Sequence, residues 1–173
     1  TLTKLTLPES LLYIGEAAFT ECTALTEVTL PDKIEELEPV VFFGCKALEK
    51  VTLPAELTTI GAACFARTAL REITLPDKLT TVGQAAFAGT ALSEVTIPAS
   101  VTDIGYSAFG WNLDVHEEFA INPDFVIHGY AGSAAQTYAS DAENGNAFTF
   151  EPIEADPQQE SRPDDDKPPV TTQ

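Results

Sequence analysis

Residues 25–47 read LTEVTLPDKIEELEPVVFFGCKA, and this pattern returns along most of the 173-residue chain. A Leu-Pro or Ile-Pro step begins at positions 7, 30, 53, 75 and 97, at intervals of 23, 23, 22 and 22 residues. A second marker recurs with the same four intervals: Phe19, Phe42, Phe65, Phe87 and Phe109. Because two unrelated residue types share one irregular spacing, the chain is predicted to be a tandem repeat that folds as a solenoid.

Each unit predicts one short strand and an opposing wall. In Val28-Thr29-Leu30 a polar residue alternates with apolar neighbours, which is typical of a strand with one buried face. Pro31 has no backbone N–H, so the strand should end there. The apolar residues that follow, Ile34 and Leu37 in this unit, should line the opposite wall. In four units a glycine comes next, where we expect a left-handed or crowded backbone: Gly15, Gly61, Gly83 and Gly105.

The five repeated phenylalanines are the predicted structural core. A unit of 22–23 residues cannot bury its apolar residues alone, so neighbouring units must stack at the strand spacing of about 4.7–4.9 Å. Stacking at this spacing would place Phe19, Phe42, Phe65, Phe87 and Phe109 in one internal aromatic column.

The repeat resembles a known family. Its pattern, Leu-x-x-Val-Thr-Leu-Pro-x-x-Ile and then Gly-x-x-Ala-Phe-x-x-Cys-x-x-Leu, is similar to the BspA-like leucine-rich repeat of bacterial surface proteins. The resemblance covers residues 1–115 in five near-complete units, but cysteine stands only at Cys22 and Cys45, and Glu38 replaces one glycine. It implies a right-handed leucine-rich-repeat solenoid, mostly β with short turns and 3-10 segments, that works in adhesion at a bacterial cell surface or outside the cell.

Three regions are expected along the chain. Residues 1–115 form the repeats, and residues 116–151 form a C-terminal cap of strand, helix and strand. In that cap we expect a strand at 126–130, a short helix near 132–143 with Ser133 as N-cap, and a last strand with Phe148 and Phe150. Residues 152–173 are acidic and rich in proline, which predicts a disordered tail or linker.

The start of the chain is expected to differ from its end. Leu2 falls where Leu25 falls in the next unit, so the chain is predicted to begin inside the array without a cap. An open coil end is a sheet edge that favours end-on dimerisation or aggregation, and the pattern leaves the oligomeric state open. No signal peptide precedes the repeats and the chain lacks Met, which indicates a mature or trimmed segment.

The net charge restricts the partners. The chain has 27 acidic and 9 basic residues, a net charge of −18, with −14 on residues 1–151 and −4 on the tail. This charge excludes simple binding to a nucleic-acid backbone and disfavours anionic membrane surfaces. No apolar run approaches the roughly 20 residues of a membrane-spanning helix. A partner must tolerate an acidic surface or meet it through cations.

Catalytic and metal-binding patterns are missing from the sequence. The two histidines, His116 and His128, lack the spacing of a catalytic or metal motif, so we predict no enzyme activity, no cofactor and no metal. The run Asp164–Asp166 is interpreted as solvated charge, because calcium sites need six to eight oxygens fixed by a loop.

The cysteines leave one question open. Cys22 and Cys45 occupy the same repeat position, so their α-carbons would lie about 5 Å apart, within disulfide range. The favoured alternative is a ladder of small side chains that bond to the backbone, since Thr68, Thr90 and Asn112 stand there in later units. Cys64 precedes Phe65 and is predicted to be a small core residue.

The candidate binding residues are two columns on the strands. The outward position between the two core positions is always threonine: Thr6, Thr29, Thr52, Thr74 and Thr96. The position two residues earlier is charged in every unit: Lys4, Glu27, Lys50, Glu72 and Glu94. Such an ordered polar face suits a protein or glycan ligand, although threonine also stabilises exposed strands without any ligand. A charged second column disfavours an ice-binding surface, which resembles paired threonine columns.

Trp111 is the remaining candidate, either as an anchor of the cap or as an exposed ligand contact. The sequence therefore predicts a non-catalytic extracellular recognition module that binds an unidentified protein or glycan through its strands. The alternative is a structural spacer on the cell surface that has no ligand of its own.

Overall fold

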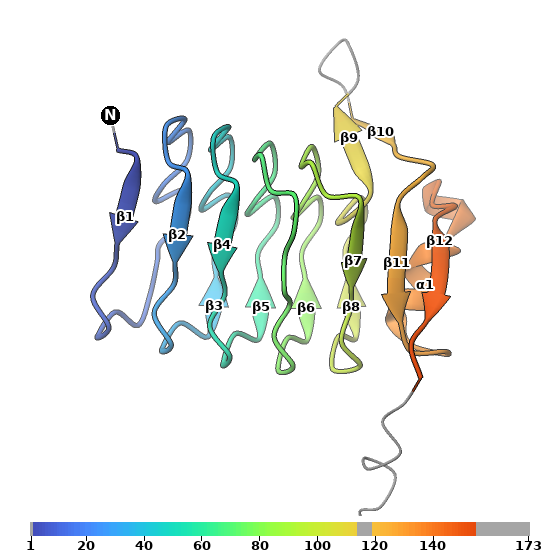
Figure 1. Cartoon of the computed structure of the whole chain (residues 1–173). Helices are drawn as coiled ribbons and strands as arrows, with labels where there is room; N and C mark the ends of the chain where they lie inside the picture. Colours follow the sequence, from blue (N-terminus) through green and yellow to red (C-terminus); the bar gives the residue numbers. More distant parts are fainter. Residues whose placement is uncertain (1, 114–118, 155–173) are drawn as a thin grey trace, which may run out of the picture.

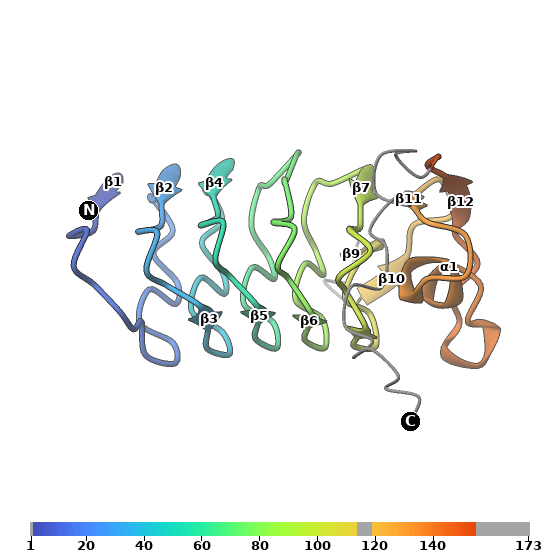
Figure 2. The same cartoon turned by 90° about the horizontal axis from the view of Figure 1, so that it is seen from below.

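The computed structural model describes residues 2–113 and 119–154. The repeats form successive coils along one axis, from the N-terminal end to a cap at the other end (Figure 1). Two walls of parallel strands face each other across the coil (Figure 2). The predicted solenoid is therefore confirmed. The predicted tail lies outside the described residues from position 155 onward.

The first wall, which we call the sheet face, carries the predicted Val-Thr strands. Its first sheet contains β1 (Lys4–Thr6), β2 (Glu27–Thr29) and β4 (Lys50–Thr52), and its second contains β7 (Glu94–Thr96), β11 (Val126–Gly129) and β12 (Thr149–Pro152). Equivalent residues of neighbouring coils pair in register, for example Val28 with Val51. The prediction of a strand in every unit is wrong for the fourth unit, in which residues 72–74 form no strand.

The opposite wall is a single four-stranded parallel sheet. It contains β3 (Glu36–Leu37), β5 (Thr59–Ile60), β6 (Thr81–Val82) and β8 (Asp103–Ile104). Leu37, Ile60 and Val82 are buried, as their place in the repeat predicts. This sheet runs without interruption past the fourth unit, so the two walls differ there.

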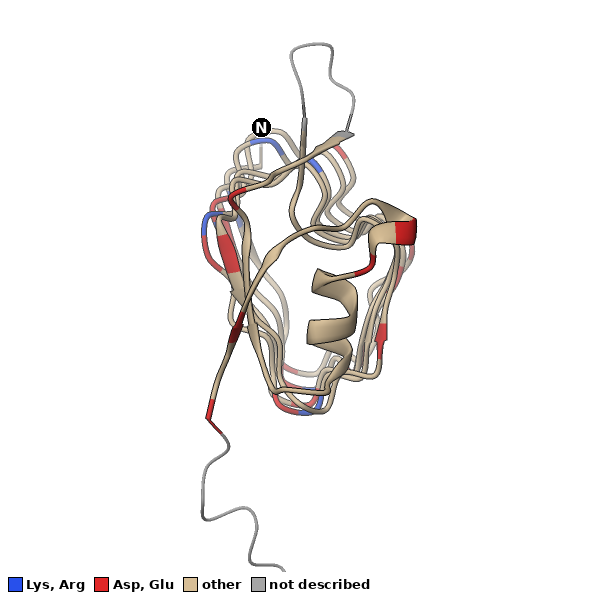
Figure 3. Ribbon diagram, turned by 90° about the vertical axis from the view of Figure 1, so that its right-hand side faces the viewer, with Lys and Arg blue, Asp and Glu red and all other residues tan. Residues whose placement is uncertain are grey.

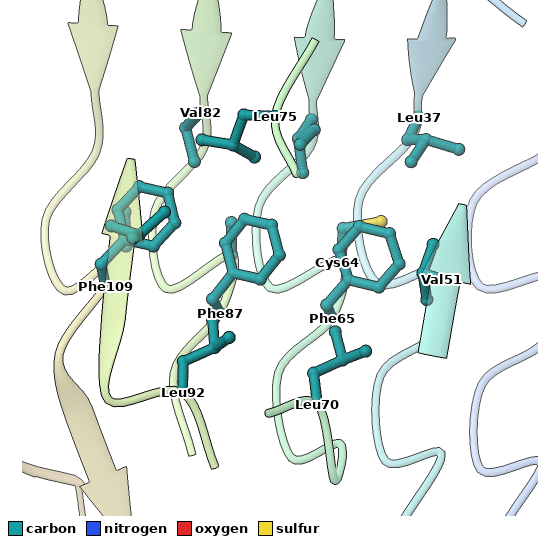
Figure 4. Packing of buried hydrophobic residues seen from close by; sticks show 14 of the residues in the cluster. Leu37, Val51, Cys64, Phe65, Leu70, Leu75, Val82, Phe87, Leu92 and Phe109 are labelled. Carbon is teal, nitrogen blue, oxygen red and sulfur yellow. The ribbon is translucent and has the colours of Figure 1, made fainter. Parts of the chain in front are cut away.

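The turns between the walls carry the aromatic column. Four stacked pairs join Phe19, Phe42, Phe65, Phe87 and Phe109, with ring centroids 5.0–5.5 Å apart. The rings of Phe65, Phe87 and Phe109 lie in a row inside the coil (Figure 4). Backbone bonds follow the same column, because the Phe65 N–H donates to Ala86 O and the Phe87 N–H to Ala108 O. Phe19, in the first coil, is only half-buried.

The repeated glycine is needed for close approach and not for a left-handed backbone. Gly61 and Gly83 have no positive φ, so the expectation of a left-handed backbone is wrong at these positions. A Cβ at Gly61 would lie 2.5 Å from the Glu38 carbonyl carbon, and one at Gly83 would lie 2.5 Å from Ala62 N. At Gly15, in the first coil, a Cβ would meet only the Tyr13 side chain at 3.7 Å. The glycine therefore makes room for the backbone of the preceding coil.

Cys45, Thr68 and Thr90 form the predicted ladder of small side chains that bond to the backbone, Cys64 is buried in the core as predicted, and all three cysteines are free thiols. Cys45 Sγ donates to Phe19 O at 3.1 Å, and Thr68 Oγ1 donates to Phe65 O at 2.9 Å. Burial raises the pKa of Cys45 to about 11 and raises the pKa of Cys64 still further. Both thiols are therefore protonated and unreactive in the native coil.

The cap closes the last coil with strands and a short helix. An antiparallel pair, β9 (Trp111–Leu113) and β10 (Phe119–Ile121), precedes β11, and α1 (Ala134–Ala139) and a 3-10 turn (Ala142–Asn144) precede β12. The strand, the helix and the last strand lie where they were predicted. Ser133 does occupy the N-cap position, but its hydroxyl makes no capping bond and is buried without a partner. Gln136 Oε1 instead accepts the Gly132 N–H at 2.7 Å.

Tyr138 of α1 ends the aromatic column. Its hydroxyl accepts the Phe109 N–H and donates to Phe109 O, both at 2.9 Å. In the inner coils the same phenylalanine N–H donates to the next coil. Burial raises the pKa of the Tyr138 phenol, which keeps the hydroxyl proton available as a donor. The Tyr138 hydroxyl thus replaces the acceptor that a following coil would have offered to the Phe109 N–H.

Replacing Phe65 by Ala should lower the free energy of unfolding by about 3–5 kcal/mol, because a buried ring leaves a cavity in a stacked column. The matched control is Phe19→Ala, at the half-buried end of the column, which should cost less. Urea unfolding followed by circular dichroism measures both. Equal losses would contradict a core in which stacking on both sides matters.

Replacing Tyr138 by Phe should cost about 1–3 kcal/mol of unfolding free energy, because it leaves the buried N–H and C=O of Phe109 unpaired. Tyr13→Phe is the control, since Tyr13 is 61% exposed. Thermal unfolding and hydrogen exchange at the Phe109 amide provide the readouts. If the two variants unfold alike and exchange alike, Tyr138 does not secure the column.

Native-state labelling with iodoacetamide should leave Cys45 and Cys64 unmodified at pH 8. With a pKa of about 11, roughly one Cys45 thiol in a thousand is ionised at that pH. Labelling of Cys45 should accelerate as the pH approaches 11, and unfolding in urea should expose both residues. Peptide mass spectrometry identifies the modified cysteines, and rapid native labelling of Cys64 would show that it is not in the core.

Candidate functional site

The threonine column lies on the sheet face as predicted from the repeat. Thr6, Thr29 and Thr52 are paired in register on β1, β2 and β4, and all three are exposed. Thr96 on β7 and Thr74 in the fourth unit are exposed as well. The structure therefore places these five candidate residues on one wall of the coil.

The column continues into the cap, which the sequence did not reveal. His128 of β11 pairs in register with Thr96 on one side and with Glu151 of β12 on the other. The His128 Nε2 lies 3.4 Å from Glu94 Oε2, and its Nδ1 lies 3.4 Å from Glu151 Oε2. Aligning the predicted strand at 126–130 with the strand at 94–96 would have identified these residues.

The charged column contains one cross-strand ion pair among the described residues. Lys50 Nζ lies 3.4 Å from Glu27 Oε1, with side chains that are 63% and 43% exposed. A pair so open to solvent contributes little to stability, about 0–1 kcal/mol. Glu72 and Glu94 are exposed acids further along the same wall.

Trp111 belongs to the cap and not to the threonine column. It is half-buried on β9, which pairs with β10 in a separate sheet. Its Nε1 donates to Asn146 Oδ1 at 3.3 Å, and its ring lies 5.5 Å from that of Tyr106. Asn146 in turn donates to Tyr138 O at 2.9 Å. These contacts support the interpretation of Trp111 as an anchor of the cap.

The fourth unit interrupts the sheet face. We call residues 72–74 the fourth rung. Among the described residues, no backbone hydrogen bond joins residues 71–75 to β4 or to β7, and no strand is drawn between them (Figure 1). At the equivalent place one coil earlier, the Glu49 N–H does donate to Thr26 O at 3.0 Å. Backbone hydrogen bonds between the same two coils are present before and after the rung. The Phe65 N–H donates to Ala86 O, and the Thr80 N–H donates to Thr58 O.

The interruption follows a shortened turn. The third unit begins after the four residues Cys45–Leu48, whereas the fourth begins after the three residues Thr68–Leu70. The fifth unit has the same three-residue turn, Thr90–Leu92, and still forms β7, so the turn length alone does not account for the interruption. The opposite wall is unaffected, because Thr59 still pairs with Thr81.

Two hollows flank the fourth rung. One, of about 700 Å³, lies between β4 with the following Leu53 and the rung with the following Leu75 and Pro76. The other, of about 610 Å³, extends from Ile73 across Thr96 to Tyr130 and Ile153 of the cap region. Ile73 is only half-buried, whereas the equivalent Val28 and Val95 are 1% and 2% exposed. The interruption thus uncovers apolar core residues on an otherwise polar wall.

A metal-binding group of side chains and a membrane-spanning helix are both absent from the described part of the chain. In residues 2–113 and 119–154, no three His, Cys, Asp or Glu side chains are grouped so that they could hold a metal ion. His116 and Asp164–Asp166 lie outside the described residues. None of the described helices is long and apolar enough to cross a membrane. Acidic positions are distributed around the coil (Figure 3).

Comparison with known proteins identifies the repeat. A family model described as the BspA type leucine-rich repeat region matches residues 1–115 in six copies, where the Pro and Phe markers define five units. None of the curated proteins compared with the chain matches it.

Solved structures of bacterial repeat proteins are similar to the chain. A leucine-rich repeat protein from Bacteroides ovatus is 27% identical with a TM-score of 0.59, covering 76% of this chain and 43% of its own. A leucine-rich repeat protein from T. pallidum is 26% identical with a TM-score of 0.61, covering 73% and 58%. The pneumococcal vaccine antigen PcpA, at 17% identity and a TM-score of 0.65, shares the fold over 88% of this chain and 42% of its own. The chain spans about half the length of these proteins.

Proposed function

Because the chain belongs to the BspA-type leucine-rich repeat family, we propose that it is a non-catalytic recognition module that binds a protein or glycan through its sheet face. The observation that carries this proposal is the coincidence, on one wall, of the exposed threonine column and two hollows that uncover apolar residues. Ordered polar groups beside accessible apolar surface are what a recognition surface requires.

The proposed location is the surface of a bacterial cell or the medium outside it, with a role in adhesion. The family of the repeat supports this location. The rigid stack of coils supports the role as well, because solenoids present extended surfaces to their partners. The proposed module needs no cofactor and does not insert into the membrane, and its acidic coil disfavours nucleic acid as a partner.

A structural spacer is the second candidate, and one observation favours it. Threonine–threonine neighbours such as Thr29 and Thr52 stabilise a sheet without any ligand, and acids surround the coil evenly (Figure 3). A spacer that only separates other domains would have such a uniform polar surface. The two hollows at the fourth rung are the feature that a spacer does not need.

Screening the full chain on a glycan array and against extracellular proteins should give a reproducible ligand. Changing Thr29, Thr52 and Thr74 together to Lys should abolish that signal, because three long cations would cover the sheet face. The matched control carries the same three changes on the opposite wall, at Thr58, Thr80 and Thr102, and should keep the signal. Thermal unfolding verifies that both variants fold. A parent chain without any ligand would favour the spacer.

A further inference from the structure

The interruption at the fourth rung defines a slot, formed by residues 50–53 of β4 and its continuation and by residues 72–76. We propose that this slot docks an extended basic segment of a partner protein, which pairs as an added strand with the open edge of β4. The proposal rests on the proposed recognition function and specifies where on the sheet face, and by which chemistry, a protein partner binds.

Backbone groups of β4 face the slot without partners. Thr52 O accepts the Leu30 N–H at 3.0 Å, so the Thr52 backbone faces β2. In a parallel sheet consecutive residues direct their backbone groups to opposite sides, so those of Val51 and Leu53 face the slot. No backbone bond reaches them from residues 71–75 in the described structure. An open strand edge of this kind is the template for an added strand.

The floor of the slot is apolar. Leu53 and Ile73 are half-buried, although Leu30, at the position of Leu53, is 2% exposed and Val28, at the position of Ile73, is 1% exposed. An added strand directs every second side chain toward the floor, so small apolar residues at alternate positions would cover Leu53 and Ile73. Covering them would remove the apolar surface that the interruption leaves open.

The charges at the rim select a basic partner. Lys50 is paired with Glu27, and Lys78 is paired with Glu56. Glu72, at the start of the rung, and Asp77, beyond its end, form no ion pair with any described residue and are both exposed. The slot therefore presents two free carboxylates and no free ammonium group from its lining. A polypeptide supplies both the alternating backbone groups and the cations, whereas a neutral glycan supplies neither in that arrangement.

The test uses the full chain and a fluorescein-labelled peptide of eight alternating lysine and valine residues. Fluorescence anisotropy should show saturable binding, which a peptide of alternating glutamate and valine should not show. Two further peptides carry N-methyl groups on the valine amides or on the lysine amides. Only one of these two sets of amides can face β4, so one peptide should bind about tenfold more weakly and the other should bind as before. Equal binding of all basic peptides would overturn strand pairing.

The site is located by a pair of matched variants. Replacing Glu72 by Gln and Asp77 by Asn should weaken binding about tenfold, because the variant loses both carboxylates that would contact the lysines of the peptide. The control replaces the exposed acids Glu35 and Glu36 of the opposite wall by Gln, which changes the net charge equally. Equal weakening in both double variants would show attraction to the net charge alone and would overturn the slot.

The peptide test and the ligand screen together distinguish a failure of the slot proposal from a failure of the proposed recognition function. Suppose that the parent captures a ligand that the Thr29, Thr52 and Thr74 variant loses, but does not bind the basic peptide. The proposal for the slot is then wrong, whereas the proposal of recognition by the sheet face is supported. A neutral oligosaccharide that displaces the peptide would assign the slot to a glycan and overturn the proposal. If neither a ligand nor the peptide binds, the recognition function fails together with the slot.

Discussion

Every feature of this fold depends on one constraint: each coil must meet the next at the spacing of hydrogen-bonded strands, about 4.7–4.9 Å. The phenylalanine rings stack at 5.0–5.5 Å because they follow that spacing. Gly61 and Gly83 are present because a Cβ there would strike the preceding coil. Tyr138 is needed because Phe109 has no following coil: its hydroxyl accepts the Phe109 N–H, which such a coil would have paired, and donates to the Phe109 carbonyl, which Thr68 and Thr90 hydroxyls serve for Phe65 and Phe87.

The same constraint explains how much could be predicted from the sequence. Stacking forces a side chain to recur at a fixed interval, so the Phe column, the two walls and the family were readable from the periods of 22 and 23 residues. Ser133 was assigned to the helix N-cap from a local pattern, and it does lie there. Its hydroxyl is nevertheless buried without a partner, and the cap contact that forms is that of Gln136 with the Gly132 N–H. Local patterns thus located the element but not its contacts.

The candidate site divides in the same way. Alternation within the strands predicted the threonine column, and the structure places its residues on one wall. His128 and Glu151 extend that column but come from cap strands that carry no repeat, so no period indicated them. The fourth rung was missed for the opposite reason. Its Leu75-Pro76 step keeps the period and its residues keep the strand pattern, so only the three-dimensional structure reveals that residues 71–75 form no backbone bonds with β4.

Periodicity also limits where specificity can arise. Repeated units present repeated surfaces, and the charge of −14 on residues 1–151 is distributed around the coil, so neither distinguishes one coil from another (Figure 3). A ligand that binds at one place needs a departure from the repeat. The fourth rung and its surroundings are such a departure, since they combine an open edge of β4, uncovered apolar residues and two carboxylates, of Glu72 and Asp77, that pair with no cation in the described part of the chain. The opposite wall and the aromatic column continue past the fourth rung. The departure is therefore confined to the sheet face, where it distinguishes the fourth coil from its neighbours without interrupting the stack of coils.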